Sequence, residues 1–407
     1  MKRWWSGLDR EIKLLFLTWL FIGITTGIHD TTFSNFWNDI FYISSKMRGY
    51  LEFPRELPGF LIAIVSGILI FLGDIRMLGV AVMLTTIGML GESFFIWNGE
   101  LQFNWVLWNM IIWSVGTHLF LPASSSLSIK LSPKEKIGET LGIMNGAQTV
   151  SYIIGCASIW LLMGWLNSGY AWVYRVAAFF GAIAIVCVFL MKTSRPSVKE
   201  KFKFKLEFKK EYSLFYWLSV LFGARKQVFL TFAPWVIVRV YGQPATVMAT
   251  LLFIASVIGI FFKPWLGRMI DRIGERQILM AESVCFFFVC LGYGFSGYLG
   301  LGKSTIYLIF TCYIIDLLLS AVTMARTTYL HKQLVDAGDL TPTLSLGVSL
   351  DHVVAMSVPL LGGLLWEALG FESIFIAAAA IAIVNLIIAG RIVVRQGAKE
   401  IGMRREA

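Results

Sequence analysis

Apolar residues follow one another in long runs along this chain, and short polar segments separate the runs. Twelve runs are long enough to cross the ~30 Å hydrocarbon core of a bilayer as helices. They span residues 12–41, 48–74, 76–98, 103–130, 137–164, 168–192, 212–240, 243–270, 275–299, 303–331, 341–367 and 370–394. The runs are too long for barrel strands and lack two-residue alternation. The pattern therefore predicts an all-α polytopic membrane protein with twelve transmembrane helices.

Composition agrees with this prediction. Of the 407 residues, 57% are hydrophobic and only 15% are charged, whereas a soluble protein of this size needs far more polar surface. The five cysteines fall in apolar runs without the spacing of a zinc site or a disulfide framework, so we interpret them as packing residues. The basic N-terminal segment, MKRWWSGLDREIK, precedes the first run without a cleavage site and indicates an uncleaved first span.

One long polar stretch divides the runs into six and six. It extends from Lys192 to Tyr212 and is rich in lysine. We therefore expect an N-terminal six-helix bundle at residues 1–193, a basic cytoplasmic linker at 194–211, and a second six-helix bundle with a cytoplasmic tail at 212–407.

The distribution of positive charge predicts the orientation. With both termini inside, the inner segments carry 25 of the 35 Lys and Arg residues and the outer loops carry five. This is the asymmetry that the positive-inside rule describes, and it explains the net charge of +10 without nucleic acid. We expect a multi-pass monomer of the cytoplasmic membrane whose basic linker contacts lipid headgroups.

Short motifs at two predicted inner turns indicate an internal repeat. GRMIDRIGER (267–276) joins runs eight and nine, and GDIR (73–76) joins runs two and three. Aligning Asp74 with Asp271 gives an offset of 197 and places His29 on Lys226. Two parallel six-helix halves would account for such a repeat.

These features resemble the major facilitator superfamily over essentially the whole chain. The resemblance implies two pseudo-symmetric bundles, alternating access, and an inner gate at the motif. The corresponding residues are Asp74, Arg76, Gly267, Asp271, Arg272, Gly274 and Arg276. The first-half copy keeps only Asp74 and Arg76. The glycine–proline motif associated with antiporters is not recognisable in run five, which disfavours drug–proton antiport.

Ionisable residues inside the runs are candidates for the transport site. A charge near the bilayer centre costs about 2.5–3.5 kcal/mol, so it normally faces a cavity or a partner. The candidates for binding solute or a coupling proton are His29, Asp30, His118, Arg225, Lys226, Asp316, Asp351 and His352. The resemblance implies that helices one, four, seven and ten line the cavity, and each of those runs carries a candidate. In similar proton-coupled members an acidic residue stands near the position of Asp30.

Two other interpretations of the same residues stay open. The charges could form neutralising pairs, such as Asp316 with Lys226, that only hold helices in register. A zinc site at His29, His118 and His352 has no support from spacing, and we expect neither a metal nor a cofactor. Five further charges near predicted helix ends are explained by snorkelling. They are Glu92, Arg175, Lys263, Glu282 and Glu367.

The stretch LEFPRELPGF (51–60) carries charges where run two begins. A helix that starts at Pro54 would leave them in an outer rim, whereas the repeat alignment starts the helix near Arg48. Glu52, Arg55 and Glu56 share one helical face at i, i+3 and i+4 spacing. We predict a charged collar that serves as an outer gate, in which Arg55 pairs with either glutamate or reaches Asp30.

The leading functional hypothesis is secondary transport of a small polar or anionic solute by alternating access, with proton symport. Efflux of small molecules by proton antiport is the alternative within this class, and a non-transporting receptor or lipid-handling protein is the alternative of another class. An enzyme is not expected, because the sequence has no phosphate-binding glycine loop, nucleophile elbow or metal signature.

Overall fold

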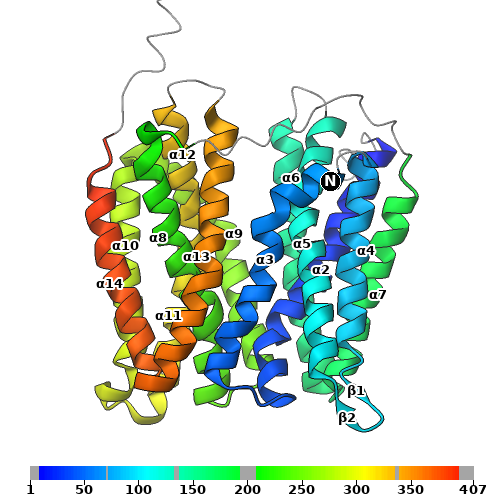
Figure 1. Cartoon of the computed structure of the whole chain (residues 1–407), viewed down its shortest axis with the longest axis horizontal. Coiled ribbons are helices and arrows are strands. Elements are labelled where there is room, and N and C mark those ends of the chain that lie inside the picture. The colour runs from blue at the N-terminus through cyan, green and yellow to red at the C-terminus, as the bar shows by residue number, and fades with distance from the viewer. Residues whose placement is uncertain (1–8, 70–71, 133–136, 193–207, 335–338, 394–407) are drawn as a thin grey trace, which may run out of the picture. The chain divides into compact units, whose positions relative to one another are not determined.

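The structure is a computed structural model of the 407-residue chain and describes residues 9–69, 72–132, 137–192, 208–334 and 339–393 (Figure 1). Most of the predicted linker, residues 194–207, lies outside these ranges. The described residues are almost entirely helical. Apart from turns and loops, they include one hairpin of two short antiparallel strands, β1 (Ile96–Trp97) and β2 (Glu100–Leu101), between α4 (Asp74–Glu92) and α5 (Phe103–Leu131).

The helices follow the predicted runs. In the first half they are α2 (Arg10–Asp39), α3 (Ser45–Leu69), α4 (Asp74–Glu92), α5 (Phe103–Leu131), α6 (Ile137–Ile159) and α7 (Tyr170–Phe189). In the second half they are α8 (Ser213–Trp235), α9 (Ala245–Ile273), α10 (Glu275–Gly294), α11 (Thr305–Leu319), α12 (Thr323–Gln333), α13 (Leu340–Leu369) and α14 (Phe371–Gly390). A short 3-10 turn, Ser320–Val322, joins α11 and α12 into one span.

Ten spans in the described part of the chain are long and apolar enough to cross a membrane. The two remaining helices are α3 and α8, which carry the charges of the LEFPRELPGF stretch and of Arg225 and Lys226. Together they give the predicted all-α, twelve-helix architecture, which is confirmed.

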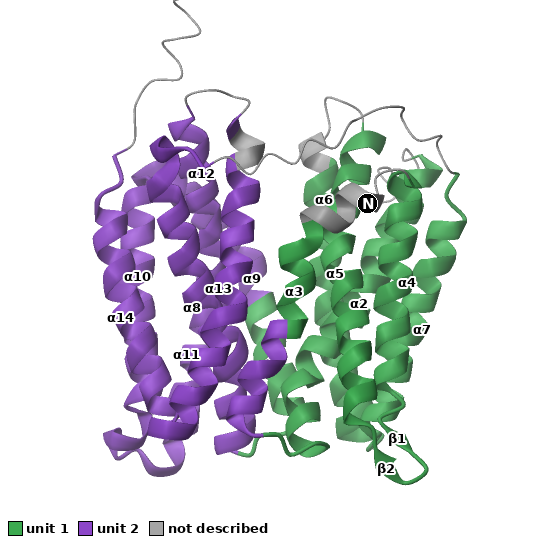
Figure 2. Cartoon of the chain, viewed as in Figure 1, with its two compact units in different colours: residues 1–43, 54–204, 242–256 green, residues 44–53, 205–241, 257–407 purple. Residues whose placement is uncertain are grey.

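The chain forms two compact units (Figure 2). Unit 1 comprises residues 1–43, 54–204 and 242–256, and unit 2 comprises residues 44–53, 205–241 and 257–407. Two short segments belong to the unit formed mainly by the other half of the chain: residues 44–53 to unit 2 and residues 242–256 to unit 1. Hydrogen bonds within each unit agree with this division. In unit 2, Trp235 Nε1 donates to Ser45 Oγ at 3.0 Å. In unit 1, Asn35 Nδ2 donates to the carbonyl oxygen of Gln243 at 2.9 Å. The division at the linker stays a prediction.

Close helix packing in unit 1 depends on glycines. A Cβ at Gly88 of α4 would lie 2.4 Å from the backbone nitrogen of Trp113, and one at Gly116 of α5 would lie 2.3 Å from that of Thr85. The backbones of α4 and α5 therefore touch, as small residues allow in membrane helices. This contact fixes Trp113 against the interior of the unit. Four of the five cysteines are also buried, and Cys285 is half-buried.

The register of the internal repeat differs from the one that the motif alignment gave. Gly73 and Gly274 have φ of 76° and 90°, and they immediately precede α4 and α10. The equivalent helix starts are Asp74 and Glu275, which are 201 positions apart, and α7 and α14 give the same offset. The offset of 197 was wrong by four residues, so His29 and Lys226 are not equivalent positions.

The start of α3 settles the question about LEFPRELPGF. The helix begins at Ser45, so Pro54 and Pro58 both lie inside it. A start at Pro54 is wrong, and the earlier start that the repeat alignment indicated is confirmed.

Candidate functional site

A buried arginine on α8 is the centre of the charged cluster in unit 2. Arg225 is 4% exposed and donates to Glu282 of α10 and, over 2.9 Å, to Asp316 Oδ1 of α11. Its guanidinium carbon lies 4.4 Å from the centre of the Phe286 ring. Arg326 of α12 supplies a second buried cation. Two cations and two carboxylates therefore balance in charge, as buried ionised groups require.

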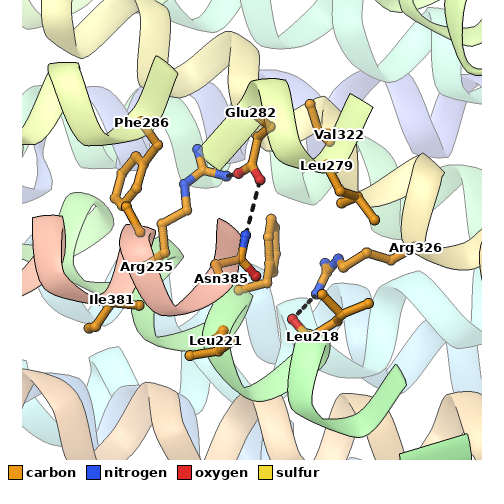
Figure 3. Close-up of a pocket in the computed structure, with 12 residues that line it drawn as sticks. Leu218, Leu221, Arg225, Leu279, Glu282, Phe286, Val322, Arg326, Ile381 and Asn385 are labelled. Carbon is orange, nitrogen blue, oxygen red and sulfur yellow. Dashed lines mark hydrogen bonds and ion pairs between the residues drawn. The ribbon is translucent and has the colours of Figure 1, made fainter. Parts of the chain in front are cut away.

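Figure 3 shows the side chains that pack around Arg225, Glu282 and Arg326. Asn385 Nδ2 lies 3.4 Å from Glu282 Oε2 and donates to it. Arg326 stacks 3.5 Å above the Phe222 ring and donates to the carbonyl oxygen of Leu218 at 3.3 Å. The pocket that these side chains line has a volume of about 10 Å³, which is about the least that holds one water. The side chains around this small pocket therefore form a packed structural network.

Arg225 and Phe222 also line a second, larger cavity. Its volume is about 200 Å³. The residues that line it are Phe222, Arg225, Lys226, Phe229, Leu230, Tyr313, Asp316, Leu317 and Ser320. Cationic, acidic and aromatic side chains from α8 and α11 thus surround one space that a small solute could enter.

Lys226 pairs with a different acid from its neighbour. Its Nζ lies 2.6 Å from Asp351 Oδ2 of α13, and the two side chains are 30% and 21% exposed. A Cβ at Gly223 would lie 2.4 Å from Asp351 Oδ1, so this glycine lets α8 come close to the acid. The pair Asp316 with Lys226, considered from the sequence, is wrong, because Arg225 takes Asp316. His352 is half-buried beside Asp351.

His29 is the centre of the polar cluster in unit 1. Its ring is buried, is stacked on Trp113 with centroids 3.6 Å apart, and has Nδ1 3.4 Å from Asp30 Oδ1. Nε2 lies 3.8 Å from Oε2 of Glu92, the last residue of α4. Asp30 is 38% exposed at its side chain, whereas Glu92 is 2% exposed. Two acids therefore flank one imidazole, and of the two it is Asp30 that has a partly exposed side chain.

His118 lies one turn after Ser114 on α5. Its Nδ1 is 2.9 Å from the carbonyl oxygen of Ser114 and 3.1 Å from Ser114 Oγ. The hydroxyl of Ser114 also donates to the carbonyl oxygen of Arg55. A ring nitrogen of His118 and a carboxylate oxygen of Glu56 come within 4.8 Å of each other. Together these contacts join α5 to the unit 1 part of α3.

The charges of LEFPRELPGF are paired within each unit. In unit 2, Glu52 is fully buried, forms an ion pair with Arg48 one turn earlier, and accepts from Gln227 Nε2 at 3.0 Å. In unit 1, Arg55 Nη2 lies 3.0 Å from Glu56 Oε1. The guanidinium of Arg55 also lies 5.6 Å from the centre of the Phe33 ring. The predicted pairing of Arg55 with a glutamate is therefore seen, and the gate function stays a prediction.

The motif residues lie around tight turns, where Asp74 of the first-half motif is itself paired and the paired acid of the second half is Glu275, next to Gly274. Asp271, Arg272 and Arg276 are exposed, and Arg76 is exposed in the first half. The paired acids are those that begin the following helices. Lys130 Nζ lies 2.7 Å from Asp74 Oδ2, and Lys332 Nζ lies 2.6 Å from Glu275 Oε1. A Cβ added at Gly267 would meet no described atom within 4 Å. The motif's role as an inner gate stays a prediction.

The end of the predicted linker is attached to the start of α13. Lys209 Nζ lies 2.5 Å from Asp339 Oδ1, and the hydroxyl of Tyr212 donates to Asp339 Oδ2 at 2.9 Å. The hydrogen bond from Lys209 lowers the pKa of the Asp339 carboxyl, and the one from Tyr212 adds to this effect. Asp339 also immediately precedes α13, where the helix dipole favours a negative charge.

Sequence reasoning missed three residues of these clusters. Glu92 and Glu282 were explained as snorkelling from helix ends, and that interpretation is wrong because both are buried, at 1% and 5% exposure. Arg326 was not considered, although it is an arginine inside a predicted span. The signal that could have found all three is the same: a charge on an apolar run needs a partner even near its end.

The chain was compared with known protein families, curated proteins and solved structures. The sequence model of the Major Facilitator Superfamily matches residues 15–341. A search of curated proteins finds no match for this chain.

Several solved structures share the fold. A mutant of the nucleoside transporter NupG has a TM-score of 0.75 at 12% identity and covers 94% of this chain and 99% of its own. A D-xylose-proton symporter has a TM-score of 0.71 at 14% identity, with coverages of 94% and 97%. The inward-open xylose transporter XylE from E. coli has a TM-score of 0.73 at 13% identity, with coverages of 97% and 98%. At these identities the likeness concerns the fold.

Proposed function

The chain belongs to the major facilitator superfamily, and from that premise we propose that it is a secondary transporter that moves a small polar or anionic solute together with protons. The solute binds in the cavity of about 200 Å³ between α8 and α11. The observation that carries this proposal is the ion pair of Lys226 with Asp351, which is only partly buried and has its cation at the cavity. We further expect the protein to work as a monomer in the cytoplasmic membrane, with both termini inside.

The pair offers a simple way to couple a proton to a solute. While Asp351 is ionised it occupies the ammonium of Lys226, which lies 2.6 Å away. A proton on Asp351 removes that interaction and frees Lys226 for an anionic or hydroxyl group of the solute. Proton and solute binding then favour each other, which is the thermodynamic condition for symport.

The cavity limits the class of solute. Pockets for drug-sized ligands have volumes of about 300–1,000 Å³, so a cavity of about 200 Å³ suits a smaller molecule. Phe222, Phe229 and Tyr313 provide flat apolar surface beside the charges. A compact polar solute with one ring meets both conditions. The solved relatives named for nucleoside and D-xylose transport support this choice of class.

Uptake by proteoliposomes tests the proposal. Vesicles containing the full chain are given radiolabelled uridine, D-xylose, an organic acid or an amino acid, with and without an inside-alkaline pH gradient. We expect the gradient to drive accumulation of at least one of them. Lys226→Ala should abolish that accumulation, because the cation that holds the solute is removed.

The control is Glu367→Gln, which changes an exposed carboxylate on the same helix as Asp351. It should leave uptake unchanged. Solute leaving the vesicles against its gradient as protons enter would support efflux by antiport instead. Absence of flux for the whole panel, with folded protein, would favour a receptor or lipid-handling role.

A further inference from the structure

We propose that Asp30, His29 and Glu92 form a proton relay inside unit 1, with Glu92 as the buried group that holds the proton. The three residues lie on α2 and at the end of α4. Asp30 is the entry because its side chain is 38% exposed, while the side chains of His29 and Glu92 are 1% and 2% exposed. The imidazole lies between the two acids, with Nδ1 3.4 Å from Asp30 and Nε2 3.8 Å from Glu92.

Two buried atoms in this cluster have no hydrogen-bond partner among the described residues. They are Nε2 of His29 and Oε1 of Glu92. A buried polar atom without a partner lowers stability, and it does so more strongly when the group is charged. No lysine or arginine of the described ranges lies within ion-pair distance of Glu92, so an ionised Glu92 would be an uncompensated buried charge. Protonation of Glu92 removes that cost.

The surroundings of His29 suit an imidazole ring that is protonated only transiently during proton transfer. Trp113 lies parallel to the imidazole, and aromatic faces stabilise a cation that stacks on them. Phe33 packs on the ring from the same helix, with centroids 5.1 Å apart. Full burial prevents the ring from keeping its charge in the absence of an ionised acid beside it.

Several titratable and charged groups face the relay from the neighbouring helices. They are Arg55 of α3, Cys156 of α6 and Tyr174 of α7. Arg55 is the positive group that acts on the imidazole, and Asp30 is the negative one. Tyr174 faces Glu92 from α7. A change of pH in the range where carboxylates and imidazole titrate therefore acts mainly on the three relay residues.

The transfer balances with one proton and no other reactant. A proton arriving on Asp30 leaves its carboxyl oxygen and forms an N–H bond at Nδ1 of His29. The N–H bond at Nε2 breaks as an O–H bond forms on Glu92. Asp30 is again a carboxylate, and His29 is again neutral with its hydrogen on the other nitrogen. The gap of 3.8 Å must shorten for the second step, because it exceeds a hydrogen bond.

The biological role of the relay rests on the proposed function, because a stored proton is useful to a transporter that couples protons to a solute. Its existence can be tested without any solute. The purified full chain in lipid vesicles is followed by infrared spectroscopy after a pH jump. The signal is the carbonyl stretch of a protonated carboxylic acid in an apolar environment.

We expect this band in the wild type and its loss in Glu92→Gln. His29→Gln should keep the band at equilibrium but slow its appearance by about a hundredfold, the lower end of what a positioned proton-transfer group contributes. Glu100→Gln, at the exposed hairpin, is the matched control and should change nothing.

A band that persists in Glu92→Gln would overturn the proposal, and so would wild-type kinetics in His29→Gln. Loss of the band with slowed kinetics in the respective variants supports the relay even if no solute is ever transported. Failure of the transport assay and failure of the relay therefore give different results.

Discussion

The Arg225 cluster of unit 2 and the Glu92 cluster of unit 1 handle buried charge in opposite ways. In unit 2 each buried cation has carboxylates or aromatic rings against it, and Arg225 contacts two acids at once. In unit 1 Arg55 and Glu56 are also paired, but among the described residues the ion-pair partner nearest the buried Glu92 is the His29 imidazole, at 3.8 Å, beyond a hydrogen bond. A fully paired cluster resists change because each partner depends on the other. A cluster with an unpaired acid responds instead to the arrival of a proton. The difference indicates that the Arg225 cluster of unit 2 holds its charges in place and that the Glu92 cluster of unit 1 can exchange a proton.

Breaking the paired cluster should have the largest effect. Arg225→Met leaves Glu282 and Asp316 as buried acids without their cation, which costs about 3–5 kcal/mol of stability. Thermal unfolding in detergent measures the loss. The triple variant Arg225→Met, Glu282→Gln, Asp316→Asn should recover much of it, because no uncompensated acid remains. An Arg225→Met variant as stable as wild type would contradict the pairing.

Glutamine substitutions at the two buried glutamates compare the units directly. Glu282→Gln removes the charge that Arg225 needs and should destabilise the protein by about 1–3 kcal/mol, the cost of an unmet buried group. Glu92→Gln replaces an acid that has no lysine or arginine within ion-pair distance among the described residues, and it should be neutral or stabilising. Unfolding of both variants under the same conditions checks this. Equal losses would mean that the two units do not differ.

The partly exposed pair should matter less for stability than for transport. Lys226→Met separates an ion pair whose side chains are 30% and 21% exposed, so we expect a loss of about 1 kcal/mol or less. Uptake should nevertheless fail, since the solute loses its cation. The measurement combines unfolding with the vesicle assay. A loss of uptake no larger than the loss of folded protein accounts for would mean that Lys226 has only a structural role.

The smallest effect should come from the ion pair outside the membrane spans. The pKa of Asp339 is lowered in the folded state by the hydrogen bonds from Lys209 and Tyr212. Its contribution to stability is therefore present above the unfolded pKa of about 4 and is lost as the pH falls through the folded pKa. Asp339→Asn should remove this part of the acid dependence of unfolding, and the exposed neighbour Glu211→Gln should not.

Sequence reasoning could predict the helices and many of the charged positions, because both depend on residue type and run length alone. It could not predict the pairings. Arg225 and Lys226 are adjacent, and only the packing of α10, α11 and α13 around α8 assigns them to Asp316 and Asp351. Glu92 was missed for a similar reason. Its position at the end of a predicted helix suggests exposure, but neighbouring helices bury the Glu92 side chain.

The buried cysteines have a practical consequence for chemical labelling. Because none of the five thiols is exposed, the native chain should react weakly with membrane-impermeant maleimides. The substitution Glu100→Cys, in β2 next to the hairpin turn, would then give the preferred site of labelling without removal of any native cysteine. Labelling of intact cells at this position and at Lys209 would report which side of the membrane each faces. The same two sites could carry fluorophores for following the protein as it works.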